Sequence, residues 1–316
     1  TVEALKVRLD EIVEQVNDDT LPLDQALDLY EEAVSLGLQV SHLLEQDIAN
    51  KNAELDNGST DGTEKDIHDI YADNEQVIYI NTKENLGGAG GFSFGIKWAA
   101  KKGYDYLWIM DDDTIPEKNT LEEFLNADKA LNGEYGFLSS YAKWIDGTAC
   151  NMNVPRISNN WRVNIDDEFN YSLMQVESAS FVSMFVKTEV VKKVGLPIKE
   201  FFIWADDVEY TRRISKQYPC YFVYKSQVVH EMGSNQATSI IESDETRLER
   251  YKLLYRNKYY IVRHGAKREK ILYWLEIKNT IRDIRKSNCS HKSKRCRIVL
   301  GSCIKGLTFK PTIEYL

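Results

Sequence analysis

Three consecutive aspartates, Asp111 to Asp113, are the residues of this 316-residue sequence whose types and spacing point most directly to chemistry. They follow an apolar run, Tyr104–Met110, that is typical of a buried β-strand. Adjacent carboxylates repel one another unless a cation neutralises them. Because successive side chains of an extended chain point in opposite directions, Asp111 and Asp113 can bind one ion from the same side. Mg²⁺ or Mn²⁺ suits such ligands and leaves positions open for a substrate phosphate. The alternative is a solvated acidic turn that caps a following helix.

A second acidic pair, Asp206 and Asp207, follows the aromatic residues Phe201, Phe202 and Trp204. Aromatic neighbours remove water from a carboxylate, which raises its pKa towards the range of a general base. The alternative is that both aspartates begin a helix and stabilise its dipole. The two roles are compatible, so the pair is a candidate catalytic site on either view.

His230 ends a short apolar run that begins at Gln227 and is predicted to be a strand. A single histidine is often a structural residue whose ring nitrogens are satisfied within the core. Because two acidic clusters precede this one, His230 is also a candidate third metal ligand.

A glycine-rich stretch, Asn85–Phe92, lies between a predicted strand, Gln76–Asn81, and a predicted helix, Phe94–Lys102. Glycines at a helix start let the backbone approach a phosphate. The dinucleotide pattern G-x-G-x-x-G is incomplete, because Ser93 stands where its third glycine belongs. A flexible turn is the remaining alternative. Together with the strand Tyr104–Met110, these segments predict a βαβ unit and hence a parallel sheet.

The combination of these motifs resembles the family-2 glycosyltransferases with the GT-A fold. The resemblance covers about residues 54–262, and it is carried by Asp56–Thr63, Asn85–Phe92, Trp108–Pro116, Phe202–Glu209 and His230. The paired glycines and the W-A-D-D-V-E run look most like the galactofuranosyl- and rhamnosyltransferase branch, which extends cell-surface polysaccharides. The resemblance implies an α/β fold whose mostly parallel sheet binds a nucleotide sugar.

The resemblance also implies a role for individual residues. Asp111 and Asp113 match the metal-binding D-x-D motif, with His230 as an additional ligand for Mg²⁺ or Mn²⁺. Asp207 matches the catalytic base, and its catalytic neighbour Asp206 is implied to bind the acceptor. The residues assigned to donor or acceptor binding are Asp56, Asn85, Gly87, Gly88, Gly91, Asp112 and Trp204.

The reaction implied is a metal-dependent, inverting transfer of a galactofuranose- or rhamnose-type sugar to a polysaccharide or lipid-linked acceptor. The metal would offset the charge that develops on the leaving diphosphate. A two-carboxylate glycosidase is the rival use of these acids, but it needs neither a metal nor a glycine-rich nucleotide loop.

The sequence departs from this family at its start. Members begin with a strand, a loop of the T-[YF]-N-R type and a helix before the strand that ends at Asp56, and this opening is absent here. We therefore expect the sheet to lack its first strand, which leaves an exposed edge. Weak transferase activity is expected unless another element covers that gap.

Residues 1–50 stand in the place of the missing opening, and they are predicted to form a helical hairpin. Apolar residues recur every three or four positions from Leu5 to Val16 and again from Leu27 to Leu43, on either side of a break at Asn17–Thr20. The run L-P-L-D-Q-A-L-D-L-Y-E-E-A resembles the small subunit of exodeoxyribonuclease VII, a non-catalytic partner of a large nuclease subunit. With a net charge of −10, this segment would repel nucleic acid, so a protein partner is expected.

The whole chain has a net charge of −9, but residues 263–316 carry +10. This basic region, with interspersed aromatic residues, suits an anionic membrane surface, and a solvated helix is the alternative. Cys289, Cys296 and Cys303 are spaced to share a helix face. The domains expected are a hairpin (1–50), a GT-A domain (51–245) and a C-terminal helical region (246–316). With no C-x-x-C pair, leader or membrane span apparent, the cytoplasm is the expected location.

The competing class of function is an interaction protein. In that alternative the hairpin is the working module, bound to an exodeoxyribonuclease large subunit, and the transferase part is inactive.

Overall fold

The computed structural model describes residues 52–71, 74, 76–159, 172–236 and 238–316, and ten residues of the first 51: 7, 8, 11, 12, 15, 25, 29, 32, 33 and 36. The chain divides into two compact units, Thr1–Asn81 and Thr82–Leu316. The boundaries expected at residues 50 and 245 stay a prediction.

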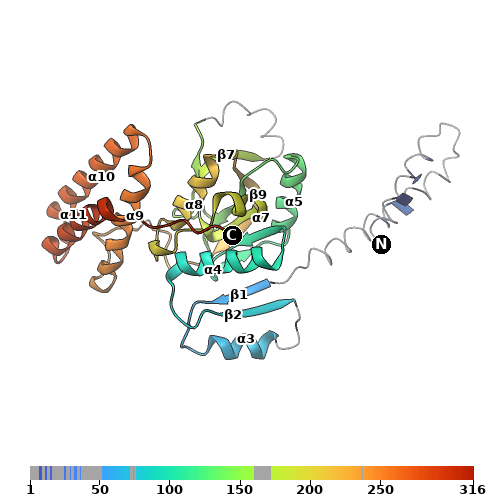
Figure 1. The fold of residues 1–316 in the computed structure, drawn as a ribbon, viewed down its shortest axis with the longest axis horizontal. Helices are drawn as coiled ribbons and strands as arrows, with labels where there is room; N and C mark the ends of the chain where they lie inside the picture. Colours follow the sequence, from blue (N-terminus) through green and yellow to red (C-terminus); the bar gives the residue numbers. More distant parts are fainter. Residues whose placement is uncertain are drawn as a thin grey trace. The chain divides into compact units, whose positions relative to one another are not determined.

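The first unit contains one βαβ element (Figure 1). Strand β1 (Asn52–Asp56) pairs in parallel with β2 (Val77–Asn81), and helix α3 (Thr63–Tyr71) connects them. Helix α3 has no buried residue, so it adds little apolar burial to this unit.

The ten described residues of the N-terminal segment are all helical. The Arg8 guanidinium pairs with the Glu32 carboxylate, Nε to Oε1 at 2.8 Å, although the residues are far apart in sequence. The pair agrees with the predicted hairpin; the rest of that prediction lies outside the described residues.

The second unit is built on a mixed sheet with strand order β3-β8-β5-β9-β7-β6, and β4 also pairs with β9. Its strands are β3 (Tyr106–Ile109), β4 (Thr114–Pro116), β5 (Phe137–Lys143), β6 (Arg156–Ile157), β7 (Leu173–Ser178), β8 (Met184–Lys187) and β9 (Tyr221–His230). Within this sheet β5 and β9 run parallel, and the other described pairings are antiparallel.

The α/β fold class is therefore confirmed, but the expectation of a mostly parallel sheet is wrong for this unit. Strand β3, which follows helix α4, pairs with the antiparallel β8, and β2 belongs to a separate two-stranded sheet. Strand β3 stands at one end of the strand order. An edge at this position agrees with the expected lack of a first strand.

In the part of this unit that the structure describes, four α-helices and two short 3₁₀ turns surround the strands: α4 (Gly87–Lys102), α5 (Thr120–Ala130), α7 (Thr188–Val194), α8 (Asp206–Ser215), η1 (Phe181–Ser183) and η2 (Lys199–Phe201). Helix α4 begins at Gly87, so most of the glycine-rich stretch is helical, and neither the flexible-turn alternative nor the expected start at Phe94 is correct. It ends at Gly103, whose φ of 88° gives the left-handed cap that glycine favours.

The core between these helices and the sheet is apolar. Ile96 of α4, Ile109 of β3 and Ile214 of α8 belong to one buried cluster. Helix α8 has an acidic first turn and a basic last turn, and both complement the helix dipole. Burial of one face and these charges explain why the polar sequence from Asp206 to Ser215 is helical.

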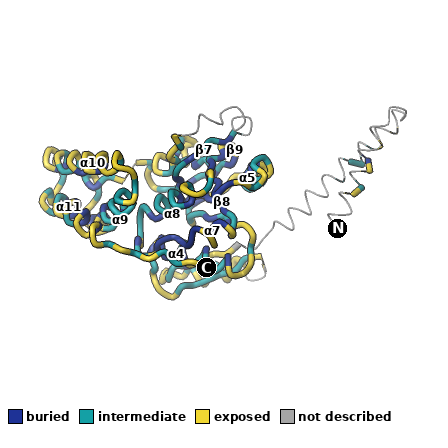
Figure 2. The backbone as a smooth tube through the Cα atoms, turned by 45° about the horizontal axis from the view of Figure 1, so that its top comes forward, coloured by how far each residue is buried: buried dark blue, intermediate teal, exposed yellow. Residues whose placement is uncertain are grey.

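The C-terminal region contains η3 (Glu245–Arg250) and the helices α9 (Tyr251–Arg263), α10 (Lys267–Lys286) and α11 (Lys292–Thr308). They share a core that includes Tyr255, Tyr273, Ile277 and Val299, and Cys289, Cys296 and Cys303 all pack into it. In Figure 2 α10 is mostly exposed or intermediate in colour. The chain then returns, and the Leu196 N–H donates to the Glu314 carbonyl at 2.8 Å. Among the described residues, no helix is both long and apolar enough to cross a bilayer.

Candidate active site

The ends of strands β3, β4 and β9 bring the first acidic cluster next to the histidine. In the β4–β9 pairing, Thr114 lies opposite His230, and the Glu231 N–H donates to the Asp113 carbonyl at 2.9 Å. His230 Nε2 lies 3.0 Å from Asp113 Oδ1 and 3.9 Å from Asp111 Oδ2. The three side chains offer ligand atoms that all lie within 4.8 Å of one another. Two carboxylates and an imidazole at this spacing can hold a divalent ion.

The other ring nitrogen of His230 is also engaged. Nδ1 lies 2.9 Å from Asn153 Oδ1, and His230 is 5% exposed. The Asn153 amide nitrogen donates to Ser180 Oγ at 3.0 Å, which orients the amide. Because an amide oxygen only accepts, Nδ1 is the donor in this contact, which leaves Nε2 available to bind an ion together with the carboxylates. Asn153 lies in a turn that carries no motif, so the sequence contained no signal for it.

The electrostatics of the cluster favour a cation. The pKa of Asp111 is raised to about 7, mainly because burial disfavours its charged form, and further because Asp113, Asp207 and Asp112 are negatively charged neighbours. Deprotonated carboxylates this close repel one another in a partly dry site, and a divalent ion would remove that repulsion. The donor set and its charge therefore fit the predicted Mg²⁺ or Mn²⁺.

The second acidic pair lies at the N-terminus of α8, within reach of the first. The negative charge of Asp207 contributes to the raised pKa of Asp111, so the two clusters interact electrostatically. The pKa values of Asp206 and Asp207 are themselves raised, mainly by burial. Asp206 is 7% exposed, and Asp207 is partly exposed. Asp207 is thus the more accessible member of a pair with elevated basicity.

The backbone before this pair is strained. Phe202, Trp204 and Ala205 have φ values of 63°, 67° and 68°, which residues other than glycine adopt only at a cost in free energy. We call residues 201–205 the left-handed loop. Such strain persists only where neighbouring groups hold it.

The glycine-rich start of α4 packs against this left-handed loop. The Ala89 N–H donates to the Phe202 carbonyl at 3.1 Å. Gly87 has a φ of 71°, and a side chain there would collide with the Phe202 carbonyl. The Gly87 N–H donates to Asn85 Oδ1 at 2.9 Å. Asn85, Gly87 and the left-handed loop are therefore brought together, as a shared substrate site would require.

The remaining predicted residues occupy different environments. Gly88 and Asp112 are exposed, whereas Gly91 is buried in α4. The Trp204 ring packs on Tyr251 of α9, with centroids 5.2 Å apart, so part of its surface faces the C-terminal helices rather than a ligand.

Asp56 lies in the other compact unit, at the end of β1, and is 6% exposed. Its carboxylate accepts hydrogen bonds from the Tyr79 hydroxyl, from Asn81 Nδ2 at 3.1 Å and from the Ser59 N–H at 2.6 Å. Burial alone would raise the pKa of Asp56, but the hydrogen bonds from Tyr79 and Ser59 outweigh it and lower this pKa. Asp56 is therefore kept ionised as an acceptor.

The mixed sheet, with an Asp-x-Asp group and a histidine at the strand ends, is the arrangement that the resemblance to GT-A glycosyltransferases implies. Comparison with known proteins confirms the resemblance predicted from the sequence. The sequence model of the family described as Glycosyl transferase family 2 matches residues 30–165. A second model, Exonuclease VII small subunit, matches residues 3–46, which confirms the resemblance of the N-terminal segment.

Two curated relatives are galactofuranosyltransferases named GlfT1. The protein of Mycolicibacterium smegmatis (strain ATCC 700084 / mc(2)155) is 25% identical over 207 residues, covering 58% of this chain and 65% of the relative. The protein of Mycobacterium tuberculosis (strain CDC 1551 / Oshkosh) is 25% identical over 177 residues, covering 52% of this chain and 55% of the relative. The chain therefore spans less than two thirds of the length of these relatives.

A solved structure with a similar fold is that of GalNAc-T7 with UDP, GalNAc and Mn²⁺. It aligns with a TM-score of 0.54 at 14% identity, and the alignment covers 80% of this chain and 48% of that one. At this identity the similarity concerns the fold alone, and it confirms the GT-A architecture.

Proposed function

We propose that this chain is a metal-dependent, inverting glycosyltransferase. The observation that carries the proposal is the Asp111–Asp113–His230 group, whose ligand atoms lie within 4.8 Å of one another. The charge of Asp207 contributes to the raised pKa of Asp111, which supports the assignment of Asp207 as a base near the metal ligands. Mg²⁺ and Mn²⁺ both suit the donor set, and the presence of an imidazole nitrogen favours Mn²⁺ over Mg²⁺.

Each group has a defined task in the proposed reaction. Asp111, Asp113 and His230 would hold the ion, which supplies Lewis-acid stabilisation of the leaving diphosphate when bound. Asp207 accepts the proton of the acceptor hydroxyl as that oxygen attacks the anomeric carbon. The new glycosidic bond forms on one face while the bond to the diphosphate breaks on the other, which inverts the anomeric configuration. Asp206 orients the acceptor beside Asp207.

We assign donor and acceptor contacts as the sequence predicts. Asp56 would contact the base of the nucleotide, and Asn85, Gly87, Gly88, Gly91 and Asp112 would line the donor. Trp204 would offer the exposed part of its ring to sugar or acceptor. A galactofuranose- or rhamnose-type donor and a cell-surface polysaccharide or lipid-linked acceptor are proposed, supported by the two relatives named as galactofuranosyltransferases.

A screen of nucleotide sugars tests this function directly. The purified chain is incubated with each donor and Mn²⁺, and release of the nucleoside diphosphate is measured with and without a chelator. We expect release with a galactofuranose or rhamnose nucleotide, and this release should stop when the metal is removed. Release that continues unchanged in chelator would refute the metal-dependent mechanism.

An anionic membrane face is proposed as the place of reaction, on the cytoplasmic side. The outer side of α10 exposes Ile271, Leu272, Trp274 and Leu275. The same helix carries seven cationic residues: Lys267, Arg268, Lys270, Lys278, Arg282, Arg285 and Lys286. Exposed apolar residues among cations suit an interface with acidic lipids. Binding to vesicles that contain acidic phospholipid, and its loss in the Trp274→Ala/Leu275→Ala variant, would support this location; equal binding to neutral vesicles would contradict it.

A second candidate function is supported by the match of residues 3–46 to the exonuclease VII small subunit. In this alternative the acidic hairpin binds an exodeoxyribonuclease large subunit, and the rest of the chain is inactive. Co-purification of the full chain with that large subunit, lost when residues 1–50 are removed, would support it. Transferase turnover by the full chain would refute the inactive role.

A further inference from the structure

The left-handed loop that precedes Asp206 and Asp207 is held by a region that lies outside the sequence motifs of the proposed site. Its three residues with positive φ would relax to ordinary backbone conformations if nothing fixed their carbonyl groups. One of these carbonyls, that of Phe202, is bound by the Ala89 N–H of α4. The partners of the neighbouring carbonyls come from α9.

Asn257 of α9 is completely buried and faces this loop. Its Nδ2 lies 3.0, 3.2 and 2.9 Å from the carbonyl oxygens of Phe201, Ile203 and Trp204. Its two amide hydrogens are therefore shared among three backbone acceptors. A buried amide that donates to three backbone carbonyls of the loop holds the loop in one conformation. Any other loop conformation would leave buried polar groups without hydrogen bonds.

Arg256 fixes the orientation of that amide. Its Nε and Nη2 donate to Asn257 Oδ1 at 3.0 and 2.8 Å. The oxygen of the amide therefore faces the guanidinium and its nitrogen faces the loop, since a flipped amide would oppose oxygen to oxygen. Arg256 also donates to the Glu200 carbonyl at 2.6 Å and packs 4.0 Å from the Phe309 ring.

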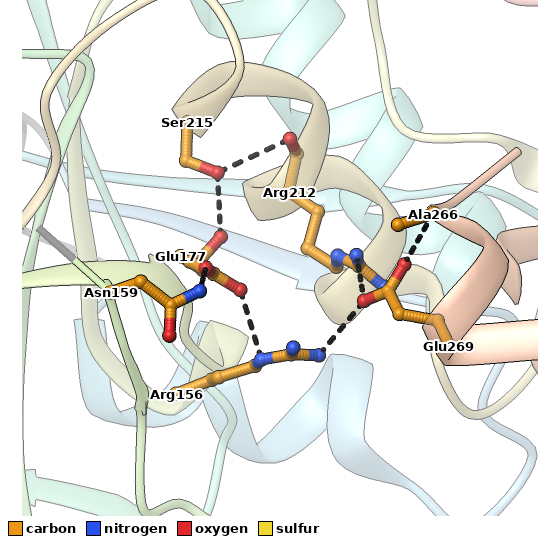
Figure 3. Close-up of polar contacts among 7 residues, drawn as sticks. All are labelled: Arg156, Asn159, Glu177, Arg212, Ser215, Ala266 and Glu269. Carbon is orange, nitrogen blue, oxygen red and sulfur yellow. Dashed lines mark hydrogen bonds and ion pairs between the residues drawn. The ribbon is translucent and has the colours of Figure 1, made fainter. Parts of the chain in front are cut away.

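An ion pair also connects the C-terminal helices to α8 itself (Figure 3). Glu269, in the first turn of α10, accepts from Arg212 of α8 at 2.6 Å and from Arg156 of β6 at 3.2 Å. Arg156 also pairs with Glu177 of β7 at 2.9 Å. Both Glu269 and Arg212 have side chains that are 16% exposed, so this ion pair is shielded from solvent. Helix α8 is thus connected to the C-terminal region both before its first residue and in its second turn.

We propose that Asn257 is a positioning residue for the transferase reaction, because its amide holds the left-handed loop and so aims Asp206 and Asp207 at the metal-binding carboxylates. This inference rests on the proposed function and assigns the C-terminal helices a part in the site. Asn257 touches neither metal ligand nor base, so it acts only through the backbone between Phe201 and Ala205.

The test uses Asn257→Asp in the full chain, because aspartate has nearly the same volume but cannot donate to the three carbonyls. We expect kcat to fall about 100-fold, as a displacement of roughly 1 Å in a catalytic group produces. The KM for the nucleotide sugar and the affinity for Mn²⁺ should stay within about twofold, since the metal ligands are untouched. Amide hydrogen exchange of residues 203–209 should become faster while the sheet strands keep their protection.

Tyr273→Phe is the matched control. It removes a buried hydroxyl that donates to the Tyr255 carbonyl at 3.2 Å in the same C-terminal core, but it does not contact the left-handed loop. This variant should keep wild-type kcat and wild-type exchange at residues 203–209. If Asn257→Asp does not fold, Arg256→Met supplies the test. It releases the amide from its partner and also removes the guanidinium's own hydrogen bond to the Phe201 carbonyl of the loop, 3.2 Å long, and it should lower kcat by a smaller factor.

The outcomes separate the two proposals. Unchanged exchange at residues 203–209 in a folded Asn257→Asp or Arg256→Met variant, or an equal loss of kcat in Tyr273→Phe, would overturn the positioning role. If the wild-type chain transfers no sugar from any donor, the proposed function fails. The exchange measurement then still decides whether Asn257 holds the loop.

Discussion

Each of the two acidic clusters contains a carboxyl group with a raised pKa, but different structural features hold the two clusters in place. Asp111 and Asp113 follow a strand, and their partner His230 ends a strand whose pairing with β4 sets it opposite Thr114. Asp206 and Asp207 follow backbone with left-handed φ values that is held by Ala89 of α4 and Asn257 of α9. The first cluster depends on the register of neighbouring strands, and the second depends on packing between elements that are distant in sequence. Variants of the two clusters should therefore fail in different ways.

Asp207→Asn should have the largest effect on turnover. Loss of a positioned base costs typically 10²–10⁴-fold in rate, so we expect kcat to fall within that range. Affinity for Mn²⁺, measured by titration calorimetry, should remain within about twofold. A loss of metal binding in this variant would show that the two clusters do not function separately.

Asp113→Asn should abolish metal binding by the cluster of Asp111, Asp113 and His230. We expect Mn²⁺ binding to be lost and turnover to fall roughly 10²–10³-fold, because the charge on the leaving group is no longer offset. Asp105→Asn is the matched control: it makes the same change of charge at an exposed position before β3. Retention of Mn²⁺-dependent turnover in Asp113→Asn would contradict the assigned ligand set.

The stability of the metal-free chain should depend on pH through Asp111. Its pKa is raised from 3.8 to about 7 in the folded state, so the native protein binds more protons than the unfolded chain between these values. Stability from this group is therefore fully present below about pH 4 and is lost as the pH rises to about 7. Mn²⁺ should reverse this loss, with about 2.7 kcal/mol at 100 times its Kd. Thermal melting should show a larger Mn²⁺-induced rise in Tm at pH 8 than at pH 5; an equal rise would contradict the assignment.

Asn153→Ala should have the smallest effect of the four. It removes the partner of His230 Nδ1 and lets the ring choose the other tautomer, which typically costs 10–100-fold in metal affinity. Asn151→Ala changes the same residue type in the same turn, where the side chain instead donates to the Asn235 carbonyl. Equal Mn²⁺ affinity in both variants would show that Asn153 does not orient the ligand.

Sequence patterns predicted the parts of the site that are local. The D-x-D spacing after an apolar run and the histidine after a second one were sufficient to predict that Asp111, Asp113 and His230 lie close together. The ends of neighbouring strands lie at the same edge of a sheet. A residue's position just after a strand therefore predicts that it lies near other residues at such positions. The direction of the neighbouring strands carries no such signal, and the antiparallel pairing of β3 with β8 was therefore missed.

The residues that hold the site in place were not predictable in this way. Asn153 meets His230, and Asn257 meets Trp204, only because the folded chain brings together turns and helices that are distant in sequence. Neither asparagine belongs to a periodic pattern or a motif. The start of α4 was also missed, because five glycines between residues 87 and 95 lower helix propensity, while close packing of Gly87 on Phe202 favours the helix.

The buried amide of Asn257 also has a consequence for biosynthesis. Asn257 is translated fifty residues after Asp207. At 5–20 residues per second, this delay is roughly 3–10 seconds. We expect the ligands of the D-x-D group to leave the ribosome well before the base acquires its final geometry. A premature stop codon before α9 would thus spare every residue of the acidic clusters and still remove the group that completes them.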